Sequence, residues 1–203
     1  MSLDNSKEDE YNHVDFKKLE IKESRMQMKN FISCTFTHCN FNGTDFQRCR
    51  FRDCTFKDCD LSLITVKDTV FSKSRFENCV LKGINWTQSE WGAGKLLFKP
   101  ADFINCNLNY STFMGLNLER VLMTGCTALE VSFEEANLSN VDCTGTDFKD
   151  SRFVHTNLTE ADLRGAKNYQ ISPTLNTLKK TRFSLPEAMS LLYNLDIVLD
   201  DGR

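Results

Sequence analysis

The sequence lacks several features that would place the protein in a membrane, outside the cell or on nucleic acid. No apolar run approaches the roughly 18 residues that a membrane-spanning helix needs. The first ten residues contain neither the basic nor the apolar region of a secretory signal peptide. The formal net charge is only −3 over 203 residues, which gives no general affinity for nucleic acid. We therefore expect a cytoplasmic protein that binds neither membrane nor nucleic acid directly.

Residues that carry chemistry are also scarce or badly spaced. There are three histidines (His13, His38 and His155), and none is coupled to an obvious nucleophile. The nine cysteines are an odd number and show none of the C-x₂-C spacings of zinc sites. The sequence predicts no catalytic residue, no metal site and no cofactor, and hence a protein that is not an enzyme.

A period of five residues fills most of the chain. Bulky, mostly apolar side chains recur every fifth position from Phe16 to Trp91, and again in a shifted phase from Phe103 to Leu163. This period fits neither the 3.6 of an α-helix nor the 2 of an ordinary strand, so the chain must turn every five residues. Such a chain stacks equivalent units into a solenoid, here a β-helix.

A second position, two residues before each large one, holds small or β-branched side chains without charge. Eight of the cysteines occupy this small position, and Cys143 occupies a large one. A free cysteine behaves there as a small apolar residue, so we expect all nine in the core. The other three places of each unit carry polar residues, as an exterior does.

Several units resemble the pentapeptide repeat family, notably Ala-Asn-Leu at 136–138, Thr-Asp-Phe at 146–148 and Ala-Asp-Leu-Arg-Gly at 161–165. The resemblance implies an all-β fold, a right-handed quadrilateral β-helix with four units to a coil. Phenylalanines twenty residues apart should then form core ladders. The expected ladders are Phe36, Phe56 and Phe76, extending back to Phe16, and Phe113, Phe133 and Phe153.

The period breaks once, between Trp91 and Phe103, which lie twelve positions apart where the period predicts ten. Two glycines and a proline mark irregular backbone. One interpretation is a projecting loop that contacts a partner, and the other is a bulge whose apolar residue still fills the core. The contact candidates in the loop are Lys95, Leu96, Leu97, Phe98 and Lys99.

The ends complete the expected organisation. Ser184–Glu187 has the pattern of a capping box before a short α-helix over 185–193, and Leu195–Leu199 alternates as a strand does. We expect a tail or cap at 1–15, a first β-helix block at 16–91, a break at 92–102, a second block at 103–167, and the helix and strand within 168–203.

This C-terminal segment is similar to the endings of the Qnr-type quinolone-resistance branch of the family, in which helix and strand form a head-to-head homodimer. The candidate dimer residues are Met189, Leu192, Tyr193, Leu195, Ile197 and Leu199. One departure is that the first block runs unbroken, whereas the plasmid-borne relatives carry an additional, earlier loop.

The resemblance implies mimicry of duplex DNA, with DNA gyrase or topoisomerase IV as the partner and protection against quinolones or gyrase-targeting toxins as the outcome. A mimic needs an acidic surface. Residues 119–164 have a charge balance of −5, whereas residues 16–91 have +4. The acidic candidates are Glu130, Glu134, Glu135, Asp142, Asp147 and Asp150. The alternative is a protein-interaction scaffold with no topoisomerase partner.

Overall fold

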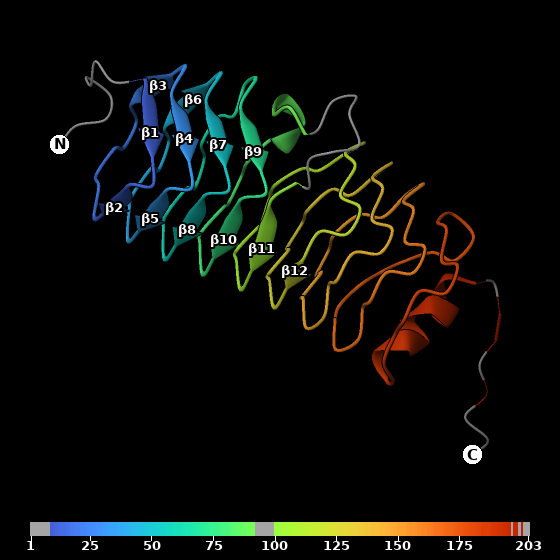
Figure 1. Cartoon of the computed structure of the whole chain (residues 1–203). Coiled ribbons are helices and arrows are strands. Elements are labelled where there is room, and N and C mark those ends of the chain that lie inside the picture. Colours follow the sequence, from blue (N-terminus) through green and yellow to red (C-terminus); the bar gives the residue numbers. More distant parts are fainter. Residues whose placement is uncertain (1–8, 92–99, 196, 199, 201–203) are drawn as a thin grey trace.

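A computed structural model describes residues 9–91, 100–195, 197–198 and 200. The chain winds into a four-sided rod whose coils follow one another from the N-terminal to the C-terminal end (Figure 1). Each turn advances by twenty residues, because Phe16 aligns with Phe36 and Phe31 with Phe51 in parallel pairing. A five-residue repeat therefore places one unit on each of four faces, as the resemblance to the pentapeptide repeat family implied.

Short parallel strands line three of the faces in the N-terminal half. Face 1 holds β1 (Glu10–Asn12), β4 (Asn30–Ile32), β7 (Arg50–Arg52) and β9 (Val70–Ser72). Face 2 holds β2 (Asp15–Lys17), β5 (Thr35–Thr37), β8 (Thr55–Lys57), β10 (Arg75–Glu77), β11 (Asp102–Ile104) and β12 (Met123–Thr124). Face 4 holds β3 (Arg25–Gln27), β6 (Asp45–Gln47) and the 3₁₀-helix η1 (Trp86–Gln88). Face 3, and the later coils of every face, are held by isolated parallel bridges such as Asn107↔Thr127.

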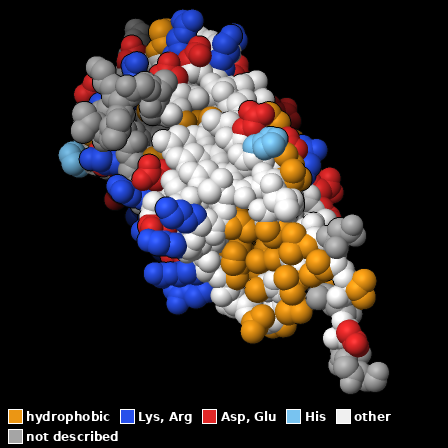
Figure 2. Space-filling view, turned by 90° about the vertical axis from the view of Figure 1, so that its right-hand side faces the viewer, with side chains coloured by type: hydrophobic (Ala, Val, Ile, Leu, Met, Phe, Trp, Pro, Cys, Tyr) orange, Lys and Arg blue, Asp and Glu red, His pale blue; other side chains and the backbone are white. Residues whose placement is uncertain are grey.

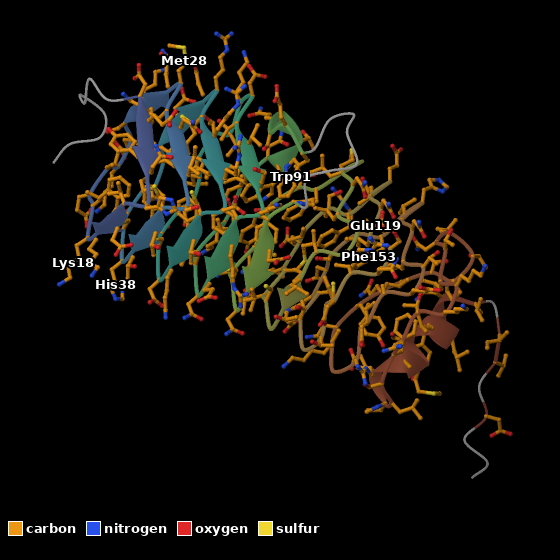
Figure 3. All side chains as sticks on the ribbon, viewed as in Figure 1. Lys18, Met28, His38, Trp91, Glu119 and Phe153 are labelled. Carbon is orange, nitrogen blue, oxygen red and sulfur yellow. The ribbon has the colours of Figure 1, made fainter. Side chains whose placement is uncertain are left out.

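The large residue of each unit points inward and stacks on its counterpart in the next coil. Phe16, Phe36, Phe56 and Phe76 stack with ring centroids 4.9, 4.7 and 4.8 Å apart. Phe113, Phe133 and Phe153 form a second ladder with spacings of 5.5 and 5.2 Å, and Trp86 extends it in the other direction at 5.9 Å. Figure 3 shows the labelled Lys18 and His38 pointing away from the rod.

The small inward residue serves the backbone as well as the core. The Cys54 thiol donates to the Phe31 carbonyl at 3.4 Å, and the Thr156 hydroxyl donates to the Phe133 carbonyl at 2.8 Å. All nine cysteines are buried, and burial raises the pKa of the Cys49 thiol to about 11 and that of Cys54 to about 12. Cys, Ser and Thr are preferred at this position because each combines a small side chain with a hydrogen-bond donor.

Corners form two residues after each large one, where the backbone takes a positive φ. His38 has φ of 53° and Gly83 has φ of 69°. These left-handed residues turn the chain from one face to the next, which explains why three of every five positions face outward.

The break in the period has a different geometry from the one expected. β10 pairs directly with β11, so Phe76 aligns with Phe103, twenty-seven residues later instead of twenty. Trp91 and Phe103 are thus successive large residues on faces 1 and 2, and the interruption adds seven residues to one unit. The expected surplus of two residues over two regular units was therefore wrong. A surplus of two residues and a surplus of seven shift the five-residue phase equally, so the sequence could not distinguish them.

Both ends also differ from expectation. The rod already begins at β1, where Tyr11 stacks on Phe31 at 5.0 Å, and bridges continue past 167 to Thr177 and Arg182. The C-terminal helix is the 3₁₀-helix η2 (Glu187–Asn194), not an α-helix. Among the described residues from 195 onward no strand forms, so the predicted strand is wrong there.

The predicted capping box is wrong as well, for an informative reason. No side-chain cap bond forms at the start of η2. Instead Ser184 Oγ accepts from the Gly165 N–H at 3.1 Å, and Glu187 Oε1 accepts from the Asn168 N–H at 2.5 Å. These N–H groups form the open edge of the last coil, so the segment caps the rod and not the helix.

Candidate protein-interaction surfaces

The interior of the rod is filled by side chains, which leaves its surface to carry function. A concavity of about 520 Å³ at the C-terminal end is lined by residues that include Lys149, Asn168, Tyr169, Glu187 and Tyr193. Within the described part of the chain, no group of three His, Cys, Asp or Glu side chains could hold a metal ion. No helix in that part is long and apolar enough to span a membrane.

The C-terminal end exposes a group of large apolar side chains. Apolar side chains gather there in Figure 2. Of the candidate dimer residues, Met189, Tyr193 and Ile197 are exposed, Leu192 and Leu195 are half-buried, and Leu199 lies outside the described residues. The candidate dimer residues do not include Leu185 and Val198, which are 77 % and 96 % exposed.

The acidic candidates do not share one face. Glu130, Asp147 and Asp150 lie on face 3 or its corner with face 4, Glu134 and Glu135 lie on face 4 and its corner with face 1, and Asp142 lies on face 2. Cations are interspersed, since Arg152 pairs with Glu134 at 3.2 Å. Lys179, Lys180 and Arg182 extend this mixture toward the C-terminal end.

The loop candidates and the three histidines were also named from the sequence. The loop candidates Lys95, Leu96, Leu97, Phe98 and Lys99 lie outside the described residues. His38 and His155 are exposed corner residues with positive φ. His13 is likewise a corner residue and belongs to the rod rather than to a tail.

Four further exposed apolar side chains lie along the sides of the rod and were missed. Met28, Leu63, Tyr110 and Met114 are 63 %, 62 %, 53 % and 42 % exposed. Figure 3 shows the labelled Met28 projecting from the rod. The signal was available, because each is a bulky apolar residue at an outward position of the repeat.

The family follows from this geometry together with a sequence match. A profile described as "Pentapeptide repeat region" matches residues 29–99 and 96–183. The chain belongs to the pentapeptide repeat family. A search of curated proteins gave no match to this pentapeptide repeat protein.

Solved structures show the same fold in other pentapeptide repeat proteins. A trypsin-treated variant of QnrB1, a plasmid-mediated fluoroquinolone resistance protein, aligns with a TM-score of 0.71 at 19 % identity, covering 93 % of this chain and 99 % of that one. HetL, a pentapeptide repeat protein involved in heterocyst differentiation regulation from the cyanobacterium Nostoc, aligns with a TM-score of 0.50 at 13 % identity, covering 85 % and 88 %. At these identities the likeness establishes the fold alone.

Proposed function

We propose that this pentapeptide repeat protein works without catalysis, by binding a type II topoisomerase, DNA gyrase or topoisomerase IV, in the place of a DNA segment. The supporting observation is the continuous four-sided rod, which matches nearly the whole of a fluoroquinolone resistance protein. Eight coil steps at about 4.8 Å give a rod about 40 Å long. In the cytoplasm such binding would protect the enzyme against quinolones or against toxins that target it.

The charge distribution supports this proposal only in the C-terminal half. There the balance of −5 over residues 119–164 gives a negative potential that a DNA-binding surface would attract. A head-to-head homodimer through the apolar C-terminal end would bring two such halves together. Met189, Tyr193 and Ile197 are the side chains that support this contact. The expected ligand is a protein, not nucleic acid.

A supercoiling assay with DNA gyrase, with and without a fluoroquinolone, tests the proposal at two salt concentrations. We expect inhibition or protection that weakens as salt rises, because exposed charges are screened. Reversing Glu134 and Glu135 to Lys, or Asp147 and Asp150 to Lys, should weaken the effect. Asp53→Lys with Asp58→Lys makes the same charge change in the basic half and serves as the matched control.

Dimerisation needs a separate measurement. Sedimentation should give a dimer mass, and Met189→Asp with Tyr193→Asp should give a monomer that remains folded by circular dichroism. A monomeric parent protein would reject the dimer and leave the topoisomerase proposal to the supercoiling assay.

A second candidate, a protein-interaction scaffold without a topoisomerase partner, is favoured by the mixture of charges. Acidic residues are distributed over three faces, and one of them is paired with Arg152. Duplex DNA carries no such cations. An inactive protein in the supercoiling assay would favour the scaffold.

A further inference from the structure

Face 4 carries a neutral stretch in the middle of the rod. In two successive coils, the outward positions of this face and of both its corners have no charged residue. They are Gly83, Asn85, Thr87, Gln88, Tyr110, Thr112, Met114 and Gly115. Charged residues make up 26 % of the chain, so eight adjacent outward positions without one distinguish this surface.

Three exposed apolar side chains lie on or beside this stretch. Tyr110 and Met114 belong to it, and Leu63 occupies the same corner column as Gly83 and Tyr110. A Cβ atom added to Gly83 would lie 2.7 Å from the Leu63 Cδ2 atom. The Leu63 side chain therefore lies over Gly83 and toward Tyr110. We call Leu63, Gly83, Tyr110 and Met114 the apolar patch.

The next coil places a row of carboxylates across the whole width of face 4. Glu130 lies at one corner, Glu134 on the face and Glu135 at the other corner. Glu134 pairs with Arg152 at 3.2 Å, whereas Glu130 and Glu135 form no ion pair within the described residues. The lysines of neighbouring units, Lys82 and Lys149, belong to face 3. We call Glu130, Glu134 and Glu135 the acidic row.

We propose that the apolar patch and the acidic row together bind a segment of a protein partner that combines basic residues with an apolar or aromatic anchor. The anchor would cover Tyr110 and Met114, side chains that are enriched at protein interfaces and adapt to varied shapes. Arginine could stack on the Tyr110 ring while other cations meet the carboxylates. The acidic row repels nucleic acid and anionic lipid, which leaves a basic protein segment as the occupant.

This inference rests on the broader part of the proposed function, recognition of proteins by the outer surface, and not on a topoisomerase partner. A suitable probe is a fluorescein-labelled twelve-residue peptide in which lysine and arginine alternate with phenylalanine and leucine. Its anisotropy is measured against the full chain. Two control peptides replace either the apolar or the basic residues with serine and should bind at least about tenfold more weakly.

Two double variants test the surface itself. Tyr110→Ser with Met114→Ser removes two of the three exposed apolar side chains of the apolar patch, and Glu130→Gln with Glu135→Gln removes the unpaired carboxylates. Each should weaken binding of the basic apolar peptide by about tenfold or more. The matched controls are Met28→Ser, a more exposed apolar residue at another corner, and Glu20→Gln with Glu23→Gln, which changes the net charge equally. Each control should change binding less than about twofold, and circular dichroism verifies folding.

The outcomes separate this inference from the topoisomerase proposal. Patch-dependent peptide binding by a protein that is inactive in the supercoiling assay would support the docking surface and reject the topoisomerase. Absence of peptide binding, binding unchanged in both test variants, or equal loss in the controls would overturn the docking surface. None of those results would change what the supercoiling assay says about a topoisomerase partner.

Discussion

Truncation of one central ring measures how strongly the phenylalanine ladder holds the coils together. Phe56 is fully buried and stacks between Phe36 at 4.7 Å and Phe76 at 4.8 Å. It also meets Phe51 edge-on at 5.4 Å. Replacing a buried phenylalanine by alanine costs about 3 to 5 kcal/mol. Because two stacking partners are lost at once, we expect Phe56→Ala to lower the free energy of unfolding by about 4 kcal/mol or more.

Two variants serve as references for this loss. Phe16 is half-buried and stacks on Phe36 at 4.9 Å, at the end of the same ladder. Phe16→Ala should cost about 2 kcal/mol, because less apolar area is lost and the end coil can relax. Phe56→Leu keeps most of the apolar volume and should cost about 1 kcal/mol.

Urea unfolding, followed by circular dichroism and by fluorescence of Trp86 and Trp91, gives these free energies. The urea concentration at the unfolding midpoint should be highest for Phe56→Leu, lower for Phe16→Ala and lowest for Phe56→Ala. Equal losses of unfolding free energy for Phe16→Ala and Phe56→Ala would show that stability does not depend on burial and stacking within the ladder.

Three further predictions concern the thiols, a carboxylate and a corner. Burial raises the pKa of the Cys143 thiol strongly, as it does for Cys49 and Cys54. The native protein at pH 8 should therefore resist alkylation by iodoacetamide, and all nine thiols should react once urea unfolds the chain. Rapid labelling without urea would contradict the burial of the cysteines. Hydrogen bonds from Arg164, with Arg182 nearby, lower the pKa of Asp162. The stabilisation of the fold by the Asp162 carboxylate should therefore be complete at neutral pH and lost as pH falls below about 4. In acid unfolding the stabilities of the parent protein and of Asp162→Asn should converge below that pH, and an undiminished difference would exclude the ion pair of Asp162 with Arg164. Gly83→Ala and Gly115→Ala should each cost about 1 kcal/mol, because both have positive φ, and the exposed Leu63 side chain, whose Cδ2 would lie 2.7 Å from an added Cβ on Gly83, can move aside. A much lower melting temperature for Gly83→Ala would show that Leu63 is held in place.

The sequence predicts the rod well because its information is periodic. A large inward residue every five positions and a small one two before it determine the core. The resemblance to the pentapeptide repeat family supplies the four faces and the ladders of Phe56 and Phe133. The interruption could not be resolved from the sequence, because surpluses of two and seven residues give the same phase. Only the alignment of Phe76 with Phe103 distinguishes them.

Surface features were predicted less well, for a geometric reason. Residues five apart, such as Asp142 and Asp147, lie on adjacent faces, so a locally acidic sequence does not produce one acidic face. Neighbours on a face are twenty residues apart, and it is this spacing that unites Leu63 with Gly83. The roles of Ser184 and Glu187 depended on unpaired N–H groups of the preceding coil, which a local capping pattern does not reveal.

A gyrase supercoiling assay decides whether the outer surface of this rod binds a type II topoisomerase, as proposed above. We expect inhibition, or protection from a fluoroquinolone, that weakens as salt rises. The effect should be lost in Glu134→Lys with Glu135→Lys but not in Asp53→Lys with Asp58→Lys. No effect at a large excess of the protein over gyrase, or equal effects of both double variants, would contradict the proposal.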